Sequence, residues 1–119
     1  MREPEVEARV RHYLSERDYL VTSRRDRTGP DIIANKDGKK LLVEVKGDRP
    51  GHESSPATIN VDTLTLLGQI VLRKGENLAD DYAIAIRPVH KRLIEKARPA
   101  LRELSVGILL VTDNDVREI

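Results

Sequence analysis

Two apolar segments on either side of an Asp-Gly dipeptide constrain the fold of this chain more than any other feature of its sequence. Residues 31–35 and 40–46 are rich in Ile, Leu and Val, and Asp37-Gly38 lies between them. Asp-Gly favours the positive φ angles of a two-residue β-turn, and such a turn fixes the register of the two strands that it joins. We therefore expect a tight β-hairpin here, with one defined pairing of its strands.

The expected register brings two acidic residues together. If Lys36 pairs with Lys39 beside the turn, Asp31 lies directly opposite Glu44. Directly opposed residues on one face have Cβ atoms roughly 4.5–5.5 Å apart, so two like charges there repel and require a cation between them. Lys46 follows Glu44 by two residues and emerges on the same face of the strand. Two carboxylates and one ammonium are thus expected to converge, while the alternate residues of this strand point to a buried face.

The rest of the chain alternates helical and strand patterns. Amphipathic spacing predicts helices, and short apolar runs bounded by turn residues predict strands. The predicted elements are a helix over residues 4–17, a strand from Tyr19, the hairpin, a helix with a Val61, Leu64, Leu67 and Val71 stripe capped by Asp62 and ending near Gly75, a strand over 82–86, a helix over 89–104 kinked or split by Pro99, and a strand over 106–111. This order predicts an α/β fold with a mixed β-sheet flanked by helices.

Length and composition limit the classes of protein to consider. The chain has 119 residues, 39% of them hydrophobic and 34% charged, and contains no Cys. This length fits one domain over 1–119, and the missing Cys excludes disulfides and thiolate metal sites. No stretch is apolar enough for a membrane span or signal peptide, so we expect a soluble, cytoplasmic protein. With 21 basic and 20 acidic residues, any surface that binds nucleic acid must be local.

The converging carboxylates point to a metal centre. Asp31 and Glu44 supply the oxygen ligands that Mg²⁺ or Mn²⁺ prefers, with water completing the shell. A bound divalent ion polarises a phosphoryl oxygen and lowers the pKa of its water. Lys46 would orient or deprotonate that water, or neutralise charge in the transition state. The competing interpretation is a solvated strand face on which Lys46 pairs with Asp31.

These residues resemble a known motif. Gly29-Pro30-Asp31 followed by Glu44-Val45-Lys46 is similar in letters and spacing to the PD-(D/E)xK nuclease superfamily, whose fold is restriction endonuclease-like. The resemblance implies an αβββαβ core. It also implies that Asp31 and Glu44 bind the divalent ion and that Lys46 is the catalytic lysine.

Two further site residues follow from the Holliday junction resolvase and Mrr-like branches of that superfamily. In those branches a Glu on the first helix joins the metal shell, and Glu7, twelve residues before Tyr19, occupies the matching place. Mrr-like relatives also carry Gln on the second helix, which makes Gln69 an auxiliary candidate, although position 73 is Arg and the usual pair of Gln residues is absent. The alternatives are an ordinary surface carboxylate for Glu7 and a solvent-exposed residue for Gln69.

Three arginines precede the predicted catalytic strand. Arg24, Arg25 and Arg27 are candidates for contacts with DNA phosphates, and surface solubility explains them equally well.

The sequence therefore predicts a Mg²⁺- or Mn²⁺-dependent endonuclease that hydrolyses phosphodiester bonds in DNA. The alternative is a catalytically silent module of the same fold that binds nucleic acid or another partner. Because so small a chain offers little surface for a duplex, and because cutting both strands often uses two symmetric sites, we expect a homodimer.

Overall fold

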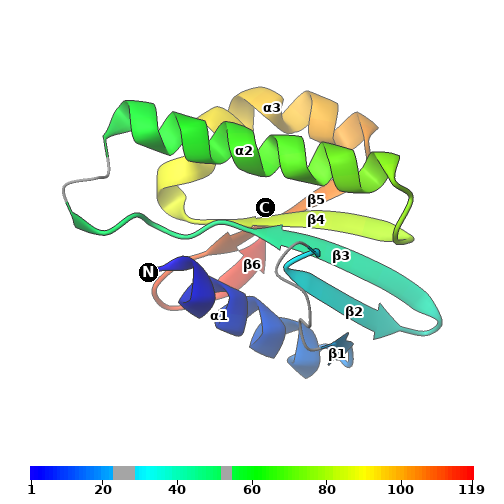
Figure 1. Cartoon of the computed structure of the whole chain (residues 1–119). Coiled ribbons are helices and arrows are strands. Elements are labelled where there is room, and N and C mark those ends of the chain that lie inside the picture. The colour runs from blue at the N-terminus through cyan, green and yellow to red at the C-terminus, as the bar shows by residue number, and fades with distance from the viewer. Residues whose placement is uncertain (23–28, 52–54) are drawn as a thin grey trace.

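A six-stranded mixed β-sheet with helices on both faces forms the body of the protein (Figure 1). The computed structural model describes residues 1–22, 29–51 and 55–119. Helix α1 covers one face of the sheet, and α2 and α3 cover the other. The helices are α1 Glu3–Glu16, α2 Pro56–Gly75 and α3 Lys91–Glu103, with a short 3-10 helix, η2, at Pro88–His90. The strands are β1 Leu20–Thr22, β2 Ile32–Lys36, β3 Lys39–Val45, β4 Asp81–Ile86, β5 Val106–Val111 and β6 Val116–Glu118.

The strands lie side by side in chain order, from β1 to β6. β3 and β4 are parallel, and so are β4 and β5, because α2 and α3 are crossover connections between them. The other neighbouring pairs, β1–β2, β2–β3 and β5–β6, are antiparallel. The predicted αβββαβ core and mixed sheet between helices are confirmed. In the part of the chain that the structure describes, no helix is both long and apolar enough to cross a membrane.

The β2–β3 hairpin has the register expected from its turn. Lys36 pairs with Lys39 and Ile32 with Val43. Asp37 and Gly38 both have positive φ angles, 53° and 77°, as a two-residue turn of this type requires. Asp31, the residue just before β2, therefore lies next to the C-terminal end of β3, where the site described below is found.

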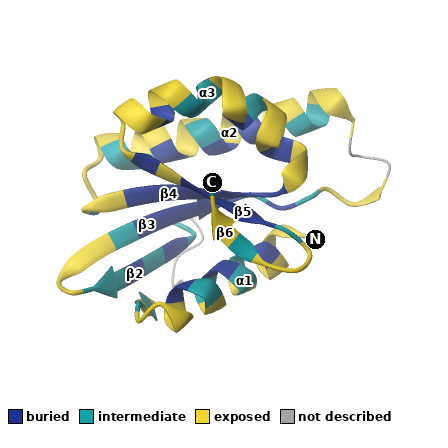
Figure 2. Ribbon diagram, turned by 180° about the vertical axis from the view of Figure 1, so that it is seen from behind, coloured by how far each residue is buried: buried dark blue, intermediate teal, exposed yellow. Residues whose placement is uncertain are grey.

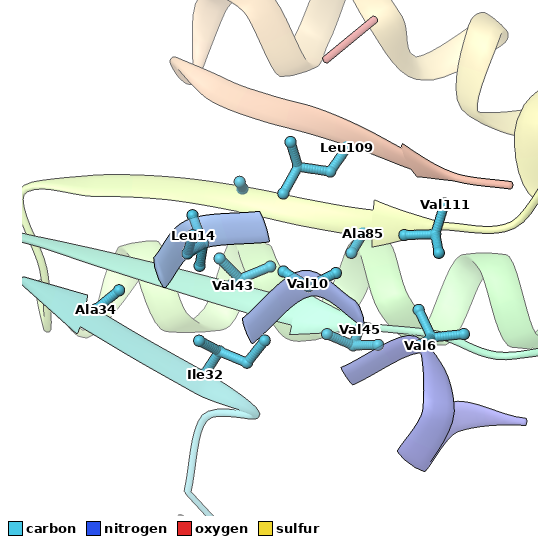
Figure 3. Close-up of a cluster of buried hydrophobic side chains, with 11 residues drawn as sticks. Val6, Val10, Leu14, Ile32, Ala34, Val43, Val45, Ala85, Leu109 and Val111 are labelled. Carbon is cyan, nitrogen blue, oxygen red and sulfur yellow. The ribbon is translucent and has the colours of Figure 1, made fainter. Parts of the chain in front are cut away.

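Both faces of the sheet are buried, in two separate hydrophobic cores (Figure 2). The core under α1 contains Val6, Val10, Leu14, Ile32, Ala34, Val43, Val45, Ala83, Ala85, Leu109 and Val111, most of which Figure 3 labels. The core under α2 and α3 contains Leu42, Leu66, Ile70, Tyr82, Ile84, Ile86, Ile94, Leu101, Val106, Ile108 and Leu110. The prediction that Val43 and Val45 face a core is confirmed, but the face carrying Glu44 is covered as well.

Helix α2 begins earlier than the sequence pattern predicted. It starts at Pro56 and is capped by Ser55, whose Oγ accepts a hydrogen bond from the backbone N–H of Thr58 at 3.2 Å. Asp62, predicted as the N-cap, lies within the helix and is buried. Ser, like Asp, is a preferred capping residue, and Pro56 fits the first helical turn, so this start was available in the sequence.

The apolar stripe predicted for α2 is wrong for three of its four residues, and only Leu67 packs partly against the core. Val61, Leu64 and Val71 leave about half of their surface exposed, at 57%, 58% and 48%. Leu66 and Ile70 face the sheet instead. This side of α2 faces inward together with Asp62 and Arg73, which pair there with Arg49 and Glu44.

Helix α3 is not split at Pro99. The helix runs unbroken from Lys91 to Glu103 through this residue, with Ile94 and Leu101 buried against the sheet. Pro99 itself is exposed. The carbonyl that loses its helical hydrogen bond to Pro99 belongs to Glu95, which is exposed as well, so this carbonyl is accessible to water.

Candidate active site

Asp31 and Glu44 meet at the end of the β2–β3 hairpin. Glu44, next to last in β3, is 3% exposed. The backbone N–H of Val45 donates a 2.8 Å hydrogen bond to Oδ2 of Asp31, which holds that carboxyl against β3. The carboxyl of Glu44 lies within hydrogen-bonding reach of the Asp31 carboxyl. We call these two residues the carboxylate pair.

The environment of the pair raises the pKa of Glu44 from its ordinary 4.5 to about 7. The largest cause is burial, which disfavours the charged carboxylate, and contact with the Asp31 carboxyl adds to it. Arg73 opposes the shift by hydrogen bonding and charge, but does not cancel it. A raised pKa from burial and a like charge is frequent at catalytic and metal-binding sites.

Arg73 is the cation beside the carboxylate pair, and sequence reasoning missed it. Its Nε donates a 3.0 Å hydrogen bond to Oε1 of Glu44 from the last turn of α2. Gln69, the predicted auxiliary residue one turn earlier, is exposed. A signal was present in the sequence, because Arg73 continues the helical spacing of Leu66 and Ile70, the residues that face the sheet.

Lys46 lies just past the end of β3, toward the start of α1. Its Nζ is 3.7 Å from Oε1 of Glu3, so this ion pair joins the strand end to the helix. The positive charge of Lys46 also acts on Asp62 of α2. The pKa of Asp62 is lowered mainly by a hydrogen bond from Arg49 and further by the charge of Lys46. Among the described residues, Arg73 is thus a cation beside Glu44, while Lys46 pairs with Glu3.

Glu7 lies on α1, at the same end of β2. Its Oε1 is buried without a hydrogen bond and is 3.8 Å from Nη2 of Arg11. Arg11 in turn donates to the carbonyl oxygens of Thr22 at 2.7 Å and Asp31 at 3.1 Å. Arg11 therefore ties the turn of α1 that carries Glu7 to the chain segment that carries Asp31.

The three predicted metal-binding carboxylates are not gathered into one cluster. Within residues 1–22, 29–51 and 55–119, no group of three or more His, Cys, Asp or Glu side chains is arranged to hold a metal ion. Asp31 and Glu44 are in contact, and Glu7 stands apart from them. Arg24, Arg25 and Arg27, the candidates for DNA contacts, lie outside the described residues.

A second polar cluster lies beside Lys46, where the parallel strands β3 and β4 end. Arg49 donates two 2.8 Å hydrogen bonds to Asp62, and Arg87 donates one of 2.9 Å to Asp48. With buried His90 these residues line a cavity of about 150 Å³. Burial lowers the pKa of His90. Sequence reasoning missed this cluster because its members come from segments far apart in the chain.

Comparison with known proteins supports the fold. No protein-family model matches the chain, and no curated protein matches it by sequence. The crystal structure of an XisH family protein from Nostoc punctiforme superposes with a TM-score of 0.53 at 17% sequence identity. The alignment covers 96% of this chain and 98% of that chain. At this identity the likeness shows the mixed α/β fold alone.

Proposed function

We propose that this chain is a metal-dependent endonuclease of the PD-(D/E)xK type that hydrolyses phosphodiester bonds in DNA. The observation that carries the proposal is that the 2.8 Å hydrogen bond from the N–H of Val45 and the hairpin register hold the Asp31 carboxyl beside the buried Glu44. This is the relation that the Pro-Asp and Glu-x-Lys halves of the motif require. A purely structural role explains the contact poorly, because placing a second carboxyl beside the buried Glu44 costs free energy.

The residues at this place fit Mg²⁺ or Mn²⁺. Mg²⁺ is commonly held by one or two carboxylates and keeps several waters, so Asp31 and Glu44 make a sufficient protein ligand set. Oε1 of Glu7 is buried without a hydrogen bond but lies apart from the pair, so Glu7 would become a third ligand only by moving toward it. When bound, the divalent ion supplies Lewis acidity toward a phosphoryl oxygen and toward water.

Other groups of the chain would orient the carboxylates, the attacking water and the substrate phosphates. The N–H of Val45 orients Asp31, and the hairpin register keeps Glu44 beside it. Lys46 is half-buried at the strand end, where it pairs with Glu3, and on this proposal its ammonium would hold the attacking water or stabilise negative charge on the phosphate. Arg24, Arg25 and Arg27 would bind phosphates that flank the scissile bond.

The test is cleavage of labelled DNA by wild type and Lys46→Ala. Substrates are single-stranded, duplex, flap and four-way junction DNA with an RNA control, each in Mg²⁺, Mn²⁺ or EDTA. We expect metal-dependent cutting that Lys46→Ala reduces roughly 100-fold or more. Lys39→Ala is the matched control, because Lys39 is an exposed lysine at the other end of β3.

The outcomes separate the proposal from its alternative. Full activity in Lys46→Ala would contradict the assignment of this lysine and with it the proposed site. If neither protein cuts any substrate, while both bind DNA without a divalent ion, the catalytically silent binding module becomes the better description.

A further inference from the structure

Arg73 gives the proposed site a charge that changes sign when a divalent ion binds. The carboxylate pair and Arg73, which hydrogen-bonds to Glu44 at 3.0 Å, carry one net negative charge as ionised groups. A divalent cation bound to the same carboxylates leaves one net positive charge. One phosphodiester group would balance that charge, so metal and phosphate together make the site neutral.

Within residues 1–22, 29–51 and 55–119, the charged residues near this site are paired with one another. Lys46 pairs with Glu3, and Glu7 lies beside Arg11, so each of these carboxylates already has a cation. Glu76 is 3.6 Å from Nη1 of Arg73, but its side chain is 52% exposed. An exposed ion pair of this kind is screened by water and contributes little.

The position of Arg73 suits a second role toward substrate. Its side chain is 21% exposed although it contacts a nearly buried carboxylate, so part of this side chain lies at the surface, where a bound substrate could reach it. A guanidinium presents several N–H donors in a planar fork and binds carboxylate and phosphate oxygens equally well. It can therefore turn from Glu44 to a phosphate oxygen without leaving the site.

We propose, on the basis of the function proposed above, that Arg73 makes divalent-ion binding depend on the DNA substrate. In the protein without DNA, Arg73 occupies Glu44 and its positive charge opposes the metal. In the complex, a backbone phosphate at the cleavage position takes Arg73 as its partner, and the carboxylate pair is released for the metal. The site then binds metal mainly when DNA is present.

The experiment is calorimetric titration of Mn²⁺ into the DNA-free protein, comparing wild type with Arg73→Gln. We expect Arg73→Gln to bind Mn²⁺ about tenfold more tightly, within the usual range for coupled binding events. Arg102→Gln, which removes an exposed arginine from α3, is the matched control and should bind as wild type does. Arg73→Met keeps the apolar stem and removes the charge, so it serves if the Gln variant does not fold.

A second titration tests the coupling to DNA. Lys46→Ala is used as the background so that a saturating DNA duplex stays intact. DNA should tighten Mn²⁺ binding in this background, and the tightening should largely disappear when Arg73→Gln is added.

The opposite order of affinities would overturn the inference. A residue that only supports a metal ligand typically costs 10–100-fold in affinity when it is lost, so weaker or unchanged Mn²⁺ binding by Arg73→Gln means that Arg73 positions Glu44 and does not compete. That result leaves the nuclease proposal intact. If wild type and all variants fail to bind Mn²⁺ with or without DNA, the metal site itself is wrong, and both proposals fall.

Discussion

Glu44 is the residue whose ionisation should change the free energy of unfolding most. Its pKa of about 7 in the folded protein is above the ordinary 4.5, mainly because of burial. A carboxyl with a raised pKa binds its proton more tightly when folded, so its favourable contribution is complete below about pH 4.5 and is lost as the pH rises through 7. Glu44→Gln mimics the protonated form and should escape that loss.

The measurement is the free energy of unfolding by urea from pH 4.5 to 8. Relative to wild type, Glu44→Gln should gain roughly 3 kcal/mol across this interval. Glu103→Gln, at an exposed position on α3, controls for the general effect of removing a carboxylate. If the curves of Glu44→Gln and wild type stay parallel over the whole range, the raised pKa of Glu44 is refuted.

The residues of the candidate site differ in how far sequence could place them. The Asp31–Glu44 contact follows from local chemistry, because an Asp-Gly turn fixes a register and the register fixes which residues oppose each other. Arg73 is 29 positions from Glu44, and its contact depends on how α2 is rotated about its axis. Lys46 follows the last residue of β3, where strand alternation no longer fixes the direction of a side chain.

At the scale of elements, the junction of β3 and α1 depends on Gly47. A Cβ atom on Gly47 would lie 2.2 Å from the backbone N of Glu3 and 2.6 Å from the carbonyl carbon of Arg2. Backbone atoms cannot give way as a flexible side chain can. Gly47→Ala should therefore force the start of α1 away from the strand end and destabilise the fold by roughly 1–3 kcal/mol.

Gly68→Ala is the matched control for this substitution. Gly68 is exposed within α2, and a Cβ there meets nothing within 4 Å. Ala in a helix interior is favoured over Gly by about 0.5–1 kcal/mol, so this variant should be slightly more stable than wild type. Thermal unfolding followed by circular dichroism checks both changes. Equal melting temperatures for the two variants would show that the close approach at Gly47 is relaxed in solution.

Helix orientation was the least predictable property of the elements. The apolar residues of α2 form two candidate stripes, one with Val61, Leu64 and Val71 and one with Leu66 and Ile70. Counting apolar positions favours the first stripe, but the second is buried. The second stripe is accompanied by Asp62 and Arg73, which enter the interior only because Arg49 and Glu44 meet them there. Tertiary ion pairs of this kind cannot be read from one helix alone.

The architecture of the whole molecule was more predictable than its polar contacts. A meander of strands followed by strand–helix–strand units leaves few ways to arrange one sheet, since crossovers between parallel strands need a helix and have a fixed hand. The observed order from β1 to β6 follows the chain without a jump. Polar clusters at the end of the sheet, such as that of Asp48, Arg87 and His90, depend on how separate connections meet, and no local pattern encodes this.

The size of the molecule leads to a prediction about its assembly. With principal extents of 42 × 28 × 27 Å, a single copy offers little surface for a duplex, and the proposed function would give it one cleavage site. Cutting both strands then requires two copies, most simply related by a two-fold axis. Light scattering should give twice the 13.4 kDa mass of the chain at micromolar concentration.

Cleavage of supercoiled plasmid gives an independent reading of the same prediction. A dimer with two coordinated sites should convert plasmid to the linear form with little accumulation of nicked circles. Mixing wild type with excess Lys46→Ala protein should turn the main product into nicked circles, because mixed dimers keep one working site. A monomeric mass together with independent nicking that the inactive partner does not alter would show that each copy acts alone, and the substrate would then be one that needs only a single-strand cut.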